Sequence, residues 1–442
     1  MSAIGPGRRG RRALGAMVCG LVLLLTFSAT AGAHAVLEKT SPGWGAVLAQ
    51  TPREITLVYD EDVVAHYARV AVVTAGGENL ARPPHVAGSV VVVPLRPGST
   101  GSYTVRWHMV ASDDGHVTEG AFSFGVRATP LPPAPARGLS VPVAPDVLAW
   151  LQFLGVVLAG GMLTVRALAL APAARLLGVR AEREAGIAIW IGVIGAVVAL
   201  HAGLLAFLVG AYPIVGGGLL NVINTQIIPI RVGTHLGQAW TVMTFAWLGV
   251  LALLVAAWVT PRRRESLLAG AGLLSLGIAF GISWASHPAS RGTVALLADY
   301  AHLLAGALWV GGVLAIAILA GVVRPLSRPT RDALVRACLL RFSRLAVPIV
   351  VVLALAGTYV AVRELPSPSA LLTSSYGITL LIKTLAFTGA VALGAYHHSV
   401  VVPRIEGGAP VATIRRTLAL EVSVLIVALS LAAVLSQTAP PR

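Results

Sequence analysis

The chain has 442 residues, of which 56% are hydrophobic and only 12% are charged, and its mean hydropathy is +0.81. Soluble proteins have about 25% charged residues, so this composition excludes a purely soluble protein and predicts a membrane protein. The formal net charge of +15 by itself would suggest a nucleic-acid partner. The distribution of the arginines gives a different explanation, described below.

The first 33 residues have the pattern of a secretory signal peptide, with a basic end at residues 8–12, an apolar core at residues 13–29 and the small-residue sequence Ala31-Gly32-Ala33. An uncleaved anchor helix is the alternative. The shortness of the apolar core and the A-x-A sequence at its end favour cleavage. Cleavage after Ala33 would make His34 the N-terminal residue.

A terminal His34 would offer two nitrogen ligands to one metal ion. These are its imidazole and its α-amine, whose pKa is about 7.7–8.0 in unperturbed chains. Nitrogen-rich, tetragonal sites favour Cu(II), the strongest binder among the common divalent metals. The sequence therefore predicts half of a Cu(II) site at the mature N-terminus.

Residues 34–127 are predicted to form an exported all-β sandwich, Ig-like or cupredoxin-like. Short stretches rich in Val, Thr, Tyr and Phe, each bounded by Pro, Gly, Asp or Asn, predict its strands. They lie at residues 54–60, 67–74, 89–95, 102–110 and 120–126. Residues 128–145 are rich in proline and predict a semi-rigid linker to the rest of the chain.

Asp114-Gly115-His116 carries the second half of the predicted site. In an extended segment, residues two apart point to the same face with Cα atoms roughly 6–7 Å apart, which suits two ligands of one ion. Taken alone, the pattern is more often a turn. Glu61, His66, His85 and His108 are weaker candidates. Met109 is the only methionine of this domain, and a soft Cu(I) site needs several sulfur ligands, so Cu(II) is preferred.

The chain has two cysteines, Cys19 in the predicted signal peptide and Cys338 in a predicted cytoplasmic loop. The mature exported domain therefore has no disulfide and no thiolate metal site.

From residue 146 the sequence predicts an all-α polytopic bundle of about eight transmembrane helices. The apolar segments lie near 146–170, 187–211, 238–259, 266–284, 296–320, 345–362, 377–400 and 415–436. If the β domain is exported, the inner loops hold 15 arginines and the outer loops three. This positive-inside pattern places both the β domain and the C-terminus on the extracytoplasmic side and explains most of the net charge without nucleic acid.

Ionisable residues inside membrane helices are costly and often functional. Five of them form a predicted copper path: His201 in the middle of the second segment, and His235, His287, Asp299 and His302 towards the outer face. Asp299 and His302 share one helix face. The alternative is that each satisfies a hydrogen bond between helices. Lys383 and Glu421 could pair to hold two helices together, and His397-His398 could be interfacial.

The exported half resembles the CopC copper-resistance family. The matching residues are His34, Ser41-Pro42-Gly43, Leu57–Glu61, Tyr103–Trp107, Ser112–His116 and Gly120–Phe124. The resemblance implies a periplasmic β-sandwich that binds Cu(II) through His34, Asp114 and His116, with the acidic Glu61 next to the ligands. The methionine-rich Cu(I) site of some members is missing here.

The membrane half resembles the CopD copper-resistance family. The matching residues are His302, Leu308–Gly312, Arg341-Phe342-Ser343, Gly357, Tyr376-Gly377, Lys383 and Glu421. The family commonly has asparagine near the position of His397-His398, so the chain departs from the family there. The two resemblances imply a CopC domain fused ahead of a CopD membrane domain.

These patterns predict a non-enzymatic copper-uptake protein of the cytoplasmic membrane, whose partners are the copper ion and the lipid bilayer. Candidate protein partners are a copper chaperone and a reductase. The sequence contains no G-x-x-x-x-G-K-[ST] nucleotide-binding loop, so direct use of ATP is not expected. Two alternatives remain open: a membrane haem redox protein with axial ligands such as His201 and His302, and a copper-delivery or sensing scaffold without transport.

Overall fold

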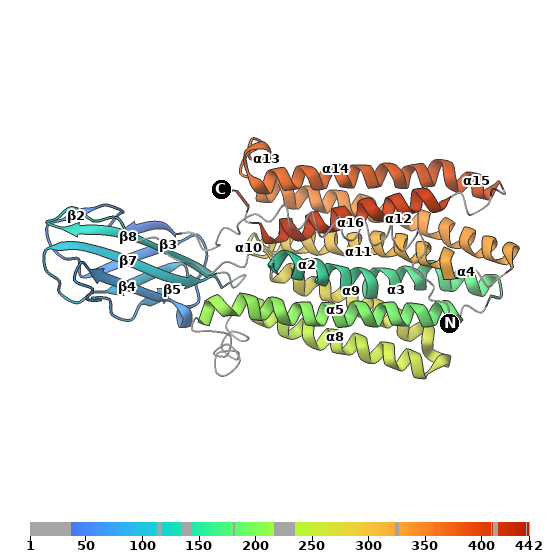
Figure 1. Ribbon diagram of the computed structural model, residues 1–442, viewed down its shortest axis with the longest axis horizontal. Helices are drawn as coiled ribbons and strands as arrows, with labels where there is room; N and C mark the ends of the chain where they lie inside the picture. The colour runs from blue at the N-terminus through green and yellow to red at the C-terminus, as the bar shows by residue number, and fades with distance from the viewer. Residues whose placement is uncertain are drawn as a thin grey trace, which may run out of the picture.

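Segments rich in β-branched and aromatic residues form the β domain at one end of the molecule, and long apolar helices form the bundle beside it (Figure 1). The computed structural model describes residues 37–112, 117–133, 144–179, 182–215, 235–322, 327–407, 409, 414–438 and 440–441. The predicted signal peptide and the predicted ligands His34, Asp114 and His116 lie outside these residues.

The β domain is a sandwich of two four-stranded sheets, ordered β1-β3-β6-β5 and β2-β8-β7-β4. Its strands are β1 (Leu37–Ser41), β2 (Val47–Leu48), β3 (Glu54–Tyr59), β4 (Arg69–Thr74), β5 (His85–Ala87), β6 (Val90–Pro94), β7 (Gly101–Val110) and β8 (Val117–Val126). Alternating side chains of both sheets meet in one core, where Ile55 and Leu57 of one sheet pack with Val105 and Phe122 of the other. The predicted all-β sandwich is confirmed.

The longest strand pair, between β7 and β8, contains a close contact between the Trp107 ring and the neighbouring strand. Trp107 lies opposite Gly120, and a Cβ atom at Gly120 would come within 2.2 Å of the Trp107 ring. The absence of a side chain at Gly120 therefore lets the Trp107 ring lie flat across the neighbouring strand.

Gly120→Ala is expected to destabilise the β domain by about 1–3 kcal/mol, because the added methyl group overfills a packed position. Gly43→Ala is the matched control, since a Cβ atom there would meet nothing within 4 Å. Urea unfolding of the two variants would measure the difference. Equal midpoints would show that the Trp107 ring shifts at little cost.

Eight helical spans in the described part of the chain are long and apolar enough to cross a membrane. The first is a continuous run of α2 (Ala144–Gly155), η2 (Val156–Gly161), α3 (Met162–Val165), η3 (Arg166–Leu170) and α4 (Ala171–Leu176), of which η2 and η3 are π-helical. The others are α5 (Glu182–Val215), α8 (His235–Val259), α9 (Arg264–Trp284), α11 (Thr293–Val322), α12 (Arg328–Glu364), α14 (Ser375–Tyr396) and α16 (Arg415–Gln437). The predicted eight-helix bundle is confirmed.

Short helices connect these spans. They are η5 (Pro261–Arg263), α10 (His287–Ser290) and α13 (Ala370–Thr373), and the π-helix η6 (His397–Val401) joins α14 to α15 (Val402–Glu406). The β domain contains the short helix η1 (Ala65–Tyr67). In Figure 1, α4 and α15 lie at the end of the bundle away from the β domain, whereas α10 and α13 lie at the near end.

Two expectations for the sixth span are wrong. The predicted helix began at residue 345, whereas α12 begins at Arg328, so the arginine-rich stretch before 345 is a helical extension rather than a loop. The prediction followed hydropathy, but arginine is a good helix former and needs no apolar surroundings to continue a helix. Cys338 is consequently buried in α12 instead of lying in a loop.

The first span is the centre of the bundle, since η2 and α3 contact α5, α9 and α11. A Cβ atom at Gly161 would come within 1.8 Å of the Ala307 carbonyl oxygen of α11. Small residues allow such close approach of helices in membranes. The bundle is therefore built around the closest crossing, between the first span and α11.

Candidate functional site

The candidate metal site lies at the connection between β7 and β8. Val110 and Val117 are directly paired at the ends of these strands, so residues 111–116 form the link between them. Asp114 and His116, in this link, and His34 lie outside the described residues, so the predicted ligand set remains a prediction.

The loop that holds Glu61 runs beside the same link. Ser112 donates its backbone N–H to the Asp62 carbonyl oxygen at 2.9 Å, and Val64 donates to the Val110 carbonyl oxygen at 2.9 Å. Residues 62–64 therefore pair with residues 110–112. The structure thus brings the half-buried Glu61 close to the chain segment that contains Asp114 and His116.

The other candidates of the β domain are separated from one another. His108 faces its cross-strand partner Glu119, with Nδ1 and Oε1 2.7 Å apart. His66 packs edge-on against Tyr67, and His85 is exposed on the edge strand β5. Within the described ranges, no three His, Cys, Asp or Glu side chains come together in a group that could hold a metal ion.

An apolar contact joins this end of the β domain to the helix bundle. Tyr67, Val110 and Phe207 are almost completely buried in it, and Val64, Val117, Leu208 and Trp240 pack around them. Phe207 of α5 stacks on Trp240 of α8 with ring centroids 4.4 Å apart. Burial raises the pKa of the Tyr67 hydroxyl, which keeps the group uncharged in the contact. We call these seven residues the docking cluster.

The predicted membrane residues divide into two groups. His235 and His287 begin α8 and α10, and the structure does not describe their side chains. Asp299 lies near Ser286, with Oδ2 3.4 Å from Oγ, and His302 Nδ1 donates to the Leu353 carbonyl oxygen of α12 at 2.9 Å. This near end of the bundle therefore carries four of the five predicted path residues.

His201 is separate from them. Its side chain is exposed on α5, and Nδ1 donates to the Val197 carbonyl oxygen of the same helix at 2.8 Å. The His302 ring is instead held against α12. Because axial haem ligands must face each other across the porphyrin, these positions do not favour the pair His201 and His302 as haem ligands.

Charges near His302 modify what it can bind. The Lys383 ammonium group acts electrostatically on His302, and the Asp299 carboxylate acts on Lys383. An ammonium group opposes a second cation at this position, whereas a carboxylate favours one. Lys383 does not form an ion pair with Glu421, whose Oε2 lies 2.8 Å from His397 Nδ1.

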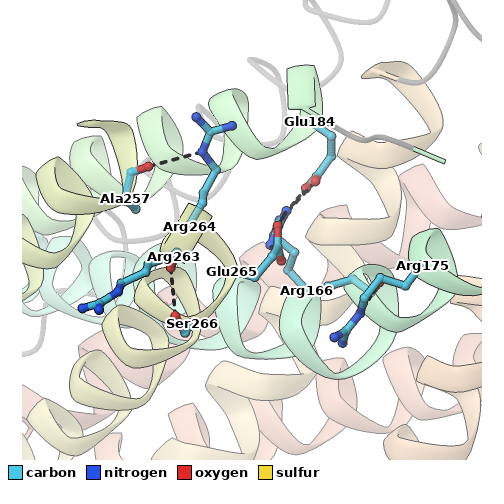
Figure 2. Close-up of polar contacts among 9 residues, drawn as sticks. Arg166, Arg175, Glu184, Ala257, Arg263, Arg264, Glu265 and Ser266 are labelled. Atoms are coloured by element: carbon cyan, nitrogen blue, oxygen red, sulfur yellow. Dashed lines mark hydrogen bonds and ion pairs between the residues drawn. The ribbon is translucent and has the colours of Figure 1, made fainter. Parts of the chain in front are cut away.

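Figure 2 shows a buried ion-pair cluster that the sequence reasoning missed. Arg166 Nε lies 3.0 Å from Glu184 Oε1, and Arg166 Nη1 lies 2.7 Å from Glu265 Oε2. Arg166 is 3% exposed, at the start of η3, so the cluster ties the first span to α5 and α9. A single arginine within an apolar span, as in the sequence around Arg166, is the signal that could have revealed it.

Comparison with known proteins finds one matching segment in the β domain and one in the helix bundle. Residues 37–127 match the family model of the CopC domain, and residues 336–435 match the family model of Copper resistance protein D. The second match begins inside α12 and ends inside α16. Residues 37–127 are therefore similar to the CopC domain and residues 336–435 to Copper resistance protein D, and the eight apolar helices indicate a multi-pass membrane protein.

One curated relative and one solved structure are also similar. The copper transport protein CutJ of Bacillus subtilis (strain 168) is 24% identical over 442 residues, covering 95% of this chain and 77% of the relative. The crystal structure of CopC from Methylosinus trichosporium OB3b has 22% sequence identity and a TM-score of 0.20, covering 24% of this chain and 100% of that chain.

Proposed function

We propose that this CopC–CopD chain captures Cu(II) outside the cytoplasmic membrane and passes copper inward through the helix bundle. His34, Asp114 and His116 are the proposed ligands, with Glu61 beside them. The name of the relative CutJ and the two family matches support copper as the ion. The excess of arginines on one side of the predicted membrane spans supports an external β domain and an external C-terminus.

The docking cluster is the observation that carries the proposal. Val110 and Val117 flank the segment with Asp114 and His116, and both belong to the cluster that contains Phe207 and Trp240 of the bundle. The proposed capture site is therefore next to the near end of the helices. His235, His287, Asp299 and His302 at that end are the proposed acceptors.

Inward movement needs no ATP. A divalent cation that enters a cell at an inside-negative potential of 100 mV gains about 4–5 kcal/mol. The proposed path needs only sites that bind copper weakly enough to release it to the next site.

The full chain in liposomes that enclose a copper chelator would test this function. Vesicles with the wild-type chain are expected to accumulate copper from the side of the β domain, and His116→Ala is expected to reduce the rate at least tenfold at limiting Cu(II). Cu(II) binding without accumulation would reject transport and favour a delivery or sensing scaffold.

Phe207→Ala tests the role of the docking cluster separately. The variant is expected to slow copper uptake about tenfold and to leave the Cu(II) affinity of the β domain unchanged, because it loosens the domain and touches no proposed ligand. Phe245→Ala on α8 is the matched control, since Phe245 is 66% exposed. Uptake by both variants at the same rate would show that transfer does not need the contact.

A further inference from the structure

A buried histidine–carboxylate pair lies in the half of the bundle away from the β domain. His397 Nδ1 lies 2.8 Å from Glu421 Oε2, and the two residues are 8% and 3% exposed. His397 begins the π-helix η6, next to α15, and Glu421 belongs to α16. The sequence suggested an interfacial position for His397, and the structure instead buries it.

The contact determines which nitrogen of the His397 imidazole carries the proton. A carboxylate oxygen can only accept a hydrogen bond, so Nδ1 carries the proton and donates it to Glu421. In the neutral ring, Nε2 then presents its lone pair. His397 Nε2 is buried and has no hydrogen-bond partner among the described residues. Metal-binding histidines commonly have this arrangement, with one nitrogen held by a carboxylate and the other free for the metal.

Charge balance favours a metal ion over a proton at Nε2. With a neutral ring, the pair carries one buried negative charge, which is costly in a membrane interior. A proton on Nε2 would neutralise the pair but leave a buried N–H without an acceptor. A metal cation would neutralise the charge and also use the lone pair.

The chain is not tightly packed beside the Glu421 carboxylate. Gly394 lies one helical turn before His397, and a Cβ atom there would meet only Glu421 Oε1 at 3.7 Å and the Trp309 ring at 3.9 Å. π-Helical turns such as η6 often occur at functional positions.

We propose that His397 Nε2 is a copper ligand on the inner half of the path, with Glu421 orienting the ring and balancing the charge. This inference rests on the proposed transport function and adds an exit site to it. No third His, Cys, Asp or Glu joins the pair in the described part of the chain. The site is therefore a weak one through which copper passes, as conduction requires.

Binding of Cu(II), buffered by the chelator nitrilotriacetate, tests the site without requiring transport. The full chain in detergent carries His116→Ala, which weakens the proposed outer Cu(II) site. In this background, His397→Asn is expected to weaken the remaining Cu(II) binding at least tenfold, and Glu421→Gln about threefold to tenfold. His398→Asn is the matched control, because exposed His398 of the same π-helix bonds to Ser343 Oγ, and it is expected to change binding less than twofold.

Glu421→Gln preserves the shape of the pair, so it remains informative if His397→Asn does not fold. The melting temperature of each variant, compared with that of the parent chain, shows whether the pair acts only by stabilising the fold. Lower melting temperatures with unchanged Cu(II) binding in both variants would overturn the inference. If those variants still took up copper at the wild-type rate, the proposed function would stand without this site. If copper binding depends on His397 but the chain accumulates no copper in vesicles, the site is supported and only the proposed transport function is rejected.

Discussion

A chain with one extra residue before His34 is expected to bind Cu(II) at least about 100-fold more weakly than a chain that begins at His34. The extension moves the α-amine away from the imidazole and replaces it with an amide, which removes one first-sphere nitrogen, and changes outside the ligands alone already cost about 10–100-fold. Binding should also weaken as pH falls through the amine pKa of about 7.7–8.0, because the protonated amine cannot bind metal.

Cu(II) titration of the two chains, followed by the d–d absorbance or by competition with a chelator, measures this effect. His85→Ala is the control, because His85 is exposed on the edge strand β5 and is not a proposed ligand. Equal affinities of the extended and unextended chains would exclude the terminal amine and leave the imidazole of His34, Asp114 and His116 as the only proposed ligands.

Arg166→Met is expected to lower the stability of the helix bundle by about 3–5 kcal/mol, because removal of one partner leaves an uncompensated buried charge. Glu184 carries most of this cost, since it is 8% exposed. The side chain of Glu265 is 52% exposed and remains partly solvated without Arg166. Thermal unfolding of the detergent-solubilised protein and the yield from membranes would measure the loss.

A compensating variant separates charge from packing. Arg166→Met combined with Glu184→Gln removes both members of the buried pair and is expected to recover more than half of the lost stability. Arg175→Ala is the matched control, because Arg175 is exposed and donates a hydrogen bond to the Ala171 carbonyl oxygen of its own helix. If the double variant is no more stable than Arg166→Met, the guanidinium acts by packing rather than by charge.

The sequence predicts all four central strands of the β domain but only one of the four edge strands, β4. The strands β1, β2 and β5 were missed. Each of these three has at most five residues, which is too short a stretch to show a clear apolar alternation. The sequence of β1, Leu-Glu-Lys-Thr-Ser, illustrates this.

The helices follow a similar rule. Apolar length reveals each membrane span, but α12 begins well before its apolar segment as an arginine-rich helix, and the span of α14 continues through η6 into α15. A helix can continue through charged residues in water or at a membrane surface, where long charged side chains reach the solvent. Hydropathy therefore predicts which part of a helix lies in the membrane, but not where the helix begins or ends.

Pairing between distant residues was the least predictable part of the candidate site. Lys383 and Glu421 have opposite charges on neighbouring predicted helices, which suggested that they pair. The structure instead pairs Glu421 with His397, and the charge that acts on Lys383 is that of Asp299. Which helix face meets which neighbour depends on small residues such as Gly161 and Gly311, where a Cβ atom would collide with the facing backbone. Such constraints appear only when the helices are packed.

The covalent connection of the two halves changes the kinetics expected of copper delivery. The docking cluster places the β domain beside its own helices, so the proposed donor and acceptor are present at an effective concentration in the millimolar range. The dilute metal outside then determines how often the domain is loaded, while each delivery is a first-order event within one molecule. Uptake per chain should therefore be independent of how densely the protein populates the membrane.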